Sequence, residues 1–166
     1  KTRPKQTGTP CLNDTRQRTV LVEQIGIVYA LGCTKDTTIL SNYIKTTYDS
    51  TDKKIKTEHF GYVFKGIVEN TREGFKLMKE YFFKHLGKDA ATAWNLCSLI
   101  GQCQTEEELK EFQTFKASGD FDKYFKGSRT IVDQAEEDAM IQVKWHQQSL
   151  TNITAVLETL TANKTQ

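Results

Sequence analysis

The stretch FGYVFKGIVENTREGFKLMKEYFFKHLG, residues 60–87, decides the fold class of this protein. Its large apolar residues recur at intervals of three and four, which places them on one face of an α-helix. They form two groups: Phe60, Val63, Phe64 and Ile67, then Phe75, Met78, Phe82 and Leu86. Gly87 follows the second group, as glycine often follows the end of a helix. The stretch therefore predicts two amphipathic helices.

The same spacing continues on both sides of this stretch. The further groups are Leu21, Ile25, Val28 and Leu31; Leu40, Tyr43, Ile44 and Thr47; residues 90–100; Leu109, Phe112 and Phe115; Phe121, Tyr124 and Phe125; Val132, Ala135, Ala139 and Val143; and Ile153, Val156, Leu157 and Leu160. The polar run Gln147-Gln148-Ser149 divides the last two groups, so we expect a long helix followed by a separate final one. No segment alternates apolar and polar residues for long enough to predict a strand.

Local signals mark where these helices begin and end. Gly101 follows residues 90–100, and Thr105-Glu106-Glu107-Glu108 forms a capping box at the start of the next helix. Ser118-Gly119 interrupts the pattern, and Ser128 is expected to act as an N-cap. Both prolines, Pro4 and Pro10, precede the helical pattern, and proline is the residue that helix interiors tolerate least.

Turn signals separate the predicted helices by roughly 15–20 residues, so successive helices should be antiparallel neighbours. The predicted fold is therefore all-α: an irregular HEAT/armadillo-like array of antiparallel helix pairs over residues 20–160. An ordinary helical bundle is the alternative. We expect a polar lead-in at residues 1–19 and a polar tail at residues 161–166.

Composition limits the classes of function. The 23 basic and 21 acidic residues give a net charge of only +2 and are scattered, whereas a nucleic-acid-binding protein concentrates basic residues on one face. We therefore expect no nucleic-acid partner. The longest apolar run, residues 25–33, is too short for the roughly 20 residues that cross a bilayer. Because the chain begins with Lys1 rather than Met, we expect it to be a fragment or a processed product.

No residue pattern predicts catalysis in this chain. The three histidines, His59, His85 and His146, are too far apart in sequence for an H-E-x-x-H zinc motif, so surface or capping roles are expected for them. Ser128, in Lys126-Gly127-Ser128-Arg129, lacks the second glycine of a G-x-S-x-G nucleophile elbow. The acidic runs Glu106–Glu108 and Glu136–Asp138 are expected at helix starts, where carboxylates favour the helix dipole. We predict no catalytic residue, no cofactor-binding residue and no metal ligand in this chain.

Three N-x-T sequons indicate the secretory pathway. Asn13, Asn152 and Asn163 are the acceptor asparagines, and we expect at least two of them to carry N-glycan when the protein passes through a eukaryotic secretory pathway. The four cysteines form no C-x-x-C pair, and their even number is compatible with disulfides without requiring them. Cys97 and Cys103 are expected to be unpaired buried thiols.

Four segments, taken in order, resemble the C-terminal helical domain of the aminopeptidase N family of zinc metallopeptidases. Residues 30–35, ALGCTK, are similar to the family's A-L-(G/A)-C-(T/S)-(K/R) turn, and residues 67–70 with Gly74 to its I-x-x-N-P-x-G hinge. Residues 105–115 are similar to its S-T-x-x-x-L segment. Residues 127–145 resemble the G-x-R-x-L-x-Q-A-L-E and N-I-x-W segments near its chain terminus. This chain departs from the pattern at Thr71, where proline is usual, and at Gln142-Val143, where Asn-Ile is usual.

The resemblance implies the C-terminal lid and scaffold portion of an enzyme that removes N-terminal residues from peptides. It implies that the zinc and its ligands lie in an upstream catalytic domain, which would be a partner of this chain together with peptide substrates and a second copy in a homodimer. It further implies a location on the extracellular face of the plasma membrane or in the secretory-pathway lumen, and a disulfide between Cys11 and Cys33. The alternatives are a non-enzymatic helical-repeat protein-binding module and a cysteine-dependent enzyme on a helical scaffold.

Overall fold

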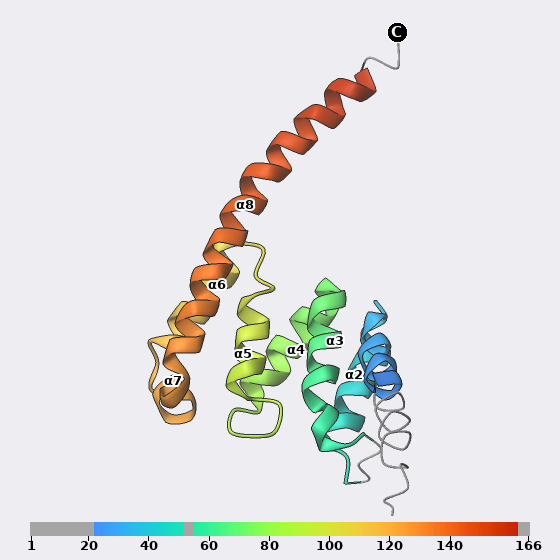
Figure 1. Ribbon diagram of the computed structural model, residues 1–166, viewed down its shortest axis with the longest axis vertical. Helices are drawn as coiled ribbons and strands as arrows, with labels where there is room; N and C mark the ends of the chain where they lie inside the picture. Colours follow the sequence, from blue (N-terminus) through green and yellow to red (C-terminus); the bar gives the residue numbers. More distant parts are fainter. Residues whose placement is uncertain (1–21, 52–54, 163–166) are drawn as a thin grey trace, which may run out of the picture.

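The computed structural model describes residues 22–51 and 55–162, and most of them are helical (Figure 1). A first helix covers residues 22–30. The elements that follow are η1 (Leu31–Cys33), α2 (Thr37–Ile44), the π-helical turn η2 (Lys45–Asp49), η3 (Thr57–His59), α3 (Phe60–Asn70), α4 (Arg72–Lys84), α5 (Ala93–Ile100), α6 (Glu106–Lys116), α7 (Gly119–Phe125), η4 (Lys126–Ser128) and α8 (Arg129–Ala162). These ranges contain no strand, and the predicted all-α array is confirmed.

Short polar side chains start most of the helices, and Thr105 of the predicted capping box is one of them. The hydroxyl of Thr71 accepts the Gly74 N–H at 2.9 Å at the start of α4, and Thr105 accepts the Glu108 N–H at 3.2 Å at the start of α6. Each satisfies a backbone donor that the first helical turn leaves unpaired. The predicted capping box is half formed, because the Glu108 carboxylate accepts the N–H of Gln104 at 2.9 Å rather than that of Thr105. Glu108 also forms an ion pair with Arg72 at the start of α4.

Most helices pack on a helix that is not their immediate neighbour in the chain. α3 contacts η1 on one side and α5 on the other, and α5 in turn contacts α8. α2 packs on α4, which pairs with α3, while α6 packs on α8. Figure 1 shows the result, a row of helices that runs from residues 22–30 through α3 and α5 to α8. Each pair buries its apolar face against its neighbours, which is how helical arrays form a continuous core.

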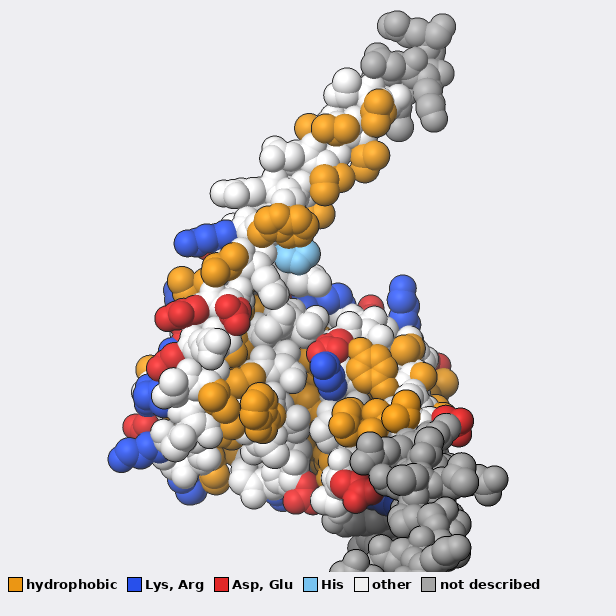
Figure 2. Space-filling view, viewed as in Figure 1, with side chains coloured by type: hydrophobic (Ala, Val, Ile, Leu, Met, Phe, Trp, Pro, Cys, Tyr) orange, Lys and Arg blue, Asp and Glu red, His pale blue; other side chains and the backbone are white. Residues whose placement is uncertain are grey.

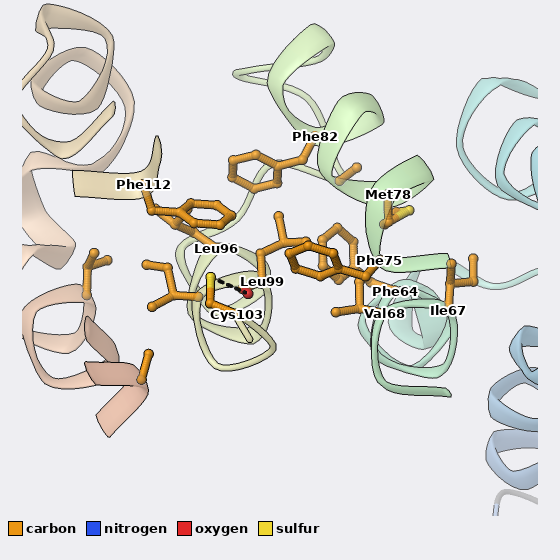
Figure 3. Packing of buried hydrophobic residues seen from close by; sticks show 14 of the residues in the cluster. Phe64, Ile67, Val68, Phe75, Met78, Phe82, Leu96, Leu99, Cys103 and Phe112 are labelled. Carbon is orange, nitrogen blue, oxygen red and sulfur yellow. Dashed lines mark hydrogen bonds between the residues drawn. The ribbon is translucent and has the colours of Figure 1, made fainter. Parts of the chain in front are cut away.

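Aromatic side chains fill the centre of this core (Figure 3). Phe64 of α3 and Phe75 and Phe82 of α4 are fully buried and lie in the space between α3, α4 and α5. The Phe82 ring lies 6.3 Å from that of Phe64 and 5.9 Å from that of Phe125, so it joins α3 and α4 to α7. These phenylalanines are residues that the helical spacing places in the core.

Three glycines allow helices to approach backbone to backbone. A Cβ on Gly32 would lie 2.4 Å from the carbonyl carbon of Gly66 in α3. A Cβ on Gly66 would lie 2.5 Å from the Tyr29 carbonyl oxygen, and one on Gly74 would lie 2.2 Å from the Ile67 carbonyl oxygen. Real Cβ contacts are not this short, so the first helix, η1 and α4 can pack on α3 as closely as they do only because these positions lack a side chain.

The predicted break after Val143 is wrong. α8 is one helix of 34 residues, and Gln147, Gln148 and Ser149 lie inside it (Figure 1). Polarity alone does not end a helix, because glutamine is a good helix former and the run contains neither glycine nor proline. Ser128 belongs to η4, the turn that immediately precedes α8. Because α8 begins at Arg129, the acidic run Glu136–Asp138 lies beyond its first turn and the predicted dipole role for that run is also wrong.

Candidate binding groove

A broad groove lies between α3 and α5. Its volume is about 670 Å³. The residues that line it are Gly61, Tyr62, Lys65 and Glu69 from α3 and Trp94, Asn95, Cys97, Ser98, Gly101 and Gln102 from α5 and the turn after it. Intervals of three and four on each helix bring these residues to the surface that faces the neighbouring helix.

Aromatic side chains border this groove. Trp94 is 75% exposed and Tyr62 is 43% exposed, although residues of these types usually bury most of their surface. Trp94 stands in the first turn of α5, where the Thr92 hydroxyl caps the helix by accepting the Asn95 N–H at 3.2 Å. The Asn95 side chain donates to the Ala90 carbonyl at 2.8 Å, which fixes the turn that presents the indole.

A charged pair lies on the α3 side of the groove. The Lys65 ammonium is 3.7 Å from the Glu69 carboxylate, which also accepts a hydrogen bond from the Tyr29 hydroxyl at 3.1 Å. Burial, and then the hydrogen bond to Glu69, raise the pKa of Tyr29. The pair therefore links the first helix to α3, and it leaves the Lys65 side chain 54% exposed at the groove.

The groove lining offers groups that can bind a ligand, among them one Lys–Glu pair, one half-buried thiol and two exposed rings. Burial raises the pKa of Cys97, whose thiol donates to the Ile131 carbonyl of α8 at 3.6 Å, so Cys97 is a poor nucleophile. Exposed aromatic rings beside a cation and a carboxylate are groups that hold a peptide chain by stacking and hydrogen bonding.

A second polar cluster lies where α2 meets the end of α4. The Tyr81 hydroxyl donates to the Asp49 carboxylate at 2.5 Å, and the Tyr81 ring stacks on His85 with 4.0 Å between ring centroids. The His85 Nδ1 lies 2.8 Å from the Tyr81 carbonyl oxygen. His85 thus closes the last turn of α4, and the predicted capping role is confirmed. Asp49 belongs to the π-helical turn η2, so this cluster ties that turn to α4.

Histidine is a residue type common in functional sites, and the prediction that His59 has a surface role is wrong. It is 4% exposed rather than on the surface, and its Nε2 has no hydrogen-bond partner within residues 22–51 and 55–162. The nearest carboxylate oxygen, on Glu58, lies 3.7 Å away. Because His59 stands at the junction of η3 and α3, the packing of Phe60 and its neighbours determines its burial, and no sequence signal could have shown it.

Only some of the residues predicted to carry a glycan or to form a disulfide lie within the described part of the chain. Asn152 lies on α8 and is exposed, whereas Asn13 and Asn163 lie outside the described residues. Cys33 is exposed at the end of η1, and Cys11 lies outside the described residues, so the disulfide between them stays a prediction. Cys97 and Cys103 are unpaired, as expected, and Cys103 is buried while Cys97 is only half-buried.

No three His, Cys, Asp or Glu side chains among the described residues are placed to hold a metal ion. No helix in the same ranges combines the length and the apolar character that crossing a bilayer requires.

We expect alkaline pH to destabilise the fold. Burial raises the pKa of Tyr43 and of Cys103 to about 12, and it also raises the pKa of Tyr48 and Tyr81. Unfolded Cys and Tyr ionise near pH 8.5 and 10, so the stability that these neutral groups contribute is complete below about pH 8.5 and is lost as the pH rises toward 12. The urea midpoint should therefore fall between pH 8 and pH 11.

The variant Tyr43→Phe provides the control for this measurement. It removes one titrating group, and with it the hydrogen bond from the Tyr43 hydroxyl to the Val28 carbonyl at 2.8 Å. The variant should start from a lower midpoint at pH 8 and lose less of it by pH 11. A wild-type midpoint that stays constant or rises over this range would contradict the prediction.

No protein-family model matches this sequence, and neither the curated proteins nor the solved structures that were compared contain a match.

Proposed function

We propose that this chain is the C-terminal lid and scaffold portion of a zinc-dependent aminopeptidase that removes N-terminal residues from peptides. The observation that carries the proposal is the position of the segments that resemble the aminopeptidase N family. Gly32, in the ALGCTK segment, is the point where η1 meets the backbone of α3, and Gly74, in the hinge segment, lies against the Ile67 carbonyl. Two of the resembling residues, Gly32 and Gly74, are thus points of close helix packing.

The proposal assigns the chemistry to an upstream catalytic domain. That domain would hold the zinc, and this chain would supply neither zinc ligands nor catalytic residues. Its role would be to enclose the cavity in which the peptide lies, with the groove between α3 and α5 as the surface that peptides contact. The same proposal includes a homodimer and a location on the extracellular face of the plasma membrane or in the secretory-pathway lumen. It also includes glycans on Asn13, Asn152 and Asn163.

The groove itself favours one alternative, a helical-repeat module that binds a protein partner without taking part in catalysis. Exposed Trp94 and Tyr62 are residue types that concentrate binding energy in protein interfaces. Both functions use the same surface. The two proposals differ in whether a catalytic domain is part of the same protein.

The test uses the whole protein that contains this chain. The coding sequence upstream of Lys1 is read for an in-frame H-E-x-x-H motif, and the full protein is assayed with aminoacyl anilides and with peptides of about ten residues. Trp94→Ala should raise KM for the long peptides severalfold and leave the anilides unchanged, since only a long substrate reaches the lid. Ile39→Ala, a change at an exposed residue of α2, is the control that should alter neither.

Two outcomes would overturn the proposal. Without the upstream motif and without aminopeptidase activity, the binding-module alternative would stand. If activity were present but Trp94→Ala affected both substrates equally, the groove would not be a surface for peptides.

A further inference from the structure

The second half of α8 projects beyond the other helices and carries an exposed apolar face. Figure 1 shows the projection, and Figure 2 shows hydrophobic side chains along one side of it. Four large apolar residues there are between 52% and 60% exposed: Leu150, Ile153, Leu157 and Leu160. Single exposed apolar residues are ordinary, whereas a continuous row of them marks an interaction surface. We call residues 150–160 the distal segment.

The spacing of these residues is that of a coiled coil. The intervals alternate strictly between four and three along one seam of α8, which consists of Ala139, Val143, His146, Leu150, Ile153, Leu157 and Leu160. A repeat that averages 3.5 residues keeps its members on one side of a slightly supercoiled helix. The partner that matches such a seam is another helix with the same repeat, so we expect a helix to cover the distal segment.

The position of the rest of the chain decides the direction of that helix. α8 packs on α5 and α6, and the seam residues Ala139 and Val143 are buried in its first half. The seam of the distal segment therefore faces the side of α8 on which α5 and α6 lie. A long helix laid on it parallel to α8 would run into α5 and α6. An antiparallel helix avoids them, because the rest of its length extends past the end of α8.

The distal segment is complementary to a second copy of itself in this antiparallel direction. Leu150 would lie opposite the partner's Leu160, and Ile153 opposite the partner's Leu157, so leucine and isoleucine would fill all four layers of the pair. Charges at the positions that flank a seam set the choice of partner, and like charges there separate identical helices. The flanking positions in this chain are uncharged: Gln147, Ser149, Thr154, Val156 and Thr161. Nothing in the sequence of the seam or its flanks therefore opposes self-pairing.

The area of such a contact is that of a weak dimer. The four seam residues and Val156, which is 57% exposed, expose on the order of 100 Å² each, so two copies would cover about 1,000 Å². That area reaches the lower limit of specific interfaces, so we expect a dissociation constant of about 1–100 µM. Asn152 lies on the side of the helix away from the seam, so a glycan on it would leave the contact open.

We infer that two copies of this chain form an antiparallel dimer through their distal segments, with Leu150 against the partner's Leu160 and Ile153 against the partner's Leu157. The inference names the contact surface of the homodimer that the proposed function includes. It rests on α8 and not on any enzymatic activity. The aminopeptidase assays and the association measurements can therefore fail independently of each other.

Sedimentation equilibrium of the whole chain tests the association. At protein concentrations of about 1–300 µM, a range that brackets the expected constant, we expect a monomer–dimer equilibrium. Ile153→Lys should weaken the dimer at least about a hundredfold, because pairing would bury an ammonium group without a partner. Ala155→Lys is the matched control. It adds the same charge at an exposed position of the same segment, on the side away from the seam, and should change the constant by no more than about twofold. Circular dichroism at 222 nm should show that both variants keep the helical content of the wild type.

Disulfide trapping tests the direction of the pair. Leu150→Cys and Leu160→Cys are made as separate variants, mixed at high concentration and oxidised with glutathione disulfide. We expect the mixed disulfide between positions 150 and 160, identified by peptide mapping among the native cysteines. Neither variant should form a disulfide with its own copy at the new position. In the antiparallel pair two copies of one position lie about 15 Å apart along the axis, whereas a disulfide requires Cα atoms within about 7 Å.

Each other outcome overturns the inference. A monomer over the whole concentration range would mean that a second copy does not cover the distal segment. A dimer that both lysine variants weaken equally, or that neither weakens, would mean that the copies associate through another surface. A disulfide between two copies of position 150 would show a parallel pair, and the argument from the position of α5 and α6 would then be wrong.

Discussion

Gly66→Ala is expected to lower the free energy of unfolding by about 1–3 kcal/mol, the range for forcing an extra methyl group into a packed interior. Its Cβ would lie 2.5 Å from the Tyr29 carbonyl oxygen and 2.9 Å from the Tyr29 Cα. Both are backbone atoms, so no side-chain rotation relieves the contact. The first helix and η1 would have to move away from α3 and would open the interface that Gly32 and Gly66 share.

The same helix contains the control for this experiment. Gly61 also lies in α3, but a Cβ there would meet nothing within 4 Å. Gly61→Ala should therefore stabilise the protein by about 0.5–1 kcal/mol, because alanine loses less backbone entropy than glycine in a helix. Urea unfolding followed by circular dichroism at 222 nm gives both values. If both variants shifted the midpoint in the same direction, the close approach would not control the packing of the first helix.

Phe82→Ala should have the largest effect of any single truncation, about 3–5 kcal/mol, as for other buried phenylalanines. Phe82 is fully buried, and its ring contacts those of Phe64, Phe83 and Phe125. Removing it leaves a cavity between α3, α4 and α7, and these helices cannot close it without losing their other contacts. A loss of this size is a large part of the 5–15 kcal/mol that stabilises a typical domain, so the variant should be partly unfolded at 37 °C.

Two comparison variants make this prediction specific. Phe82→Leu keeps most of the volume and should cost clearly less than Phe82→Ala. Ile39→Ala removes a side chain of similar hydrophobicity that is 55% exposed on α2, and it should change the stability by no more than about 0.5 kcal/mol. If Phe82→Ala cost no more than Ile39→Ala, the ring cluster would not be the centre of the core.

The sequence alone determined the helices and most of their starting points. Thr71, Thr92, Thr105 and Ser118 each cap a helix with their own side chain, and such caps depend on residues only two or three positions away. The spacing of Phe64, Phe75 and Phe82 identified a face of the core for the same reason, since helical periodicity is a local property. Caps and helical periodicity depend on neighbouring residues alone and do not require contact between helices.

Only the tertiary structure decided which surfaces meet. It made Gly66 a contact point and Gly61 an open one, although both are glycines of the same helix. It buried His59, which the sequence placed at the surface, and exposed Trp94, a residue type that is highly buried on average. The continuity of α8 through Gln147–Ser149, by contrast, follows from local helix propensity, which the polarity of the run obscured. The physical reason is that burial and close approach depend on residues distant in the sequence, whereas caps and periodicity depend on neighbours.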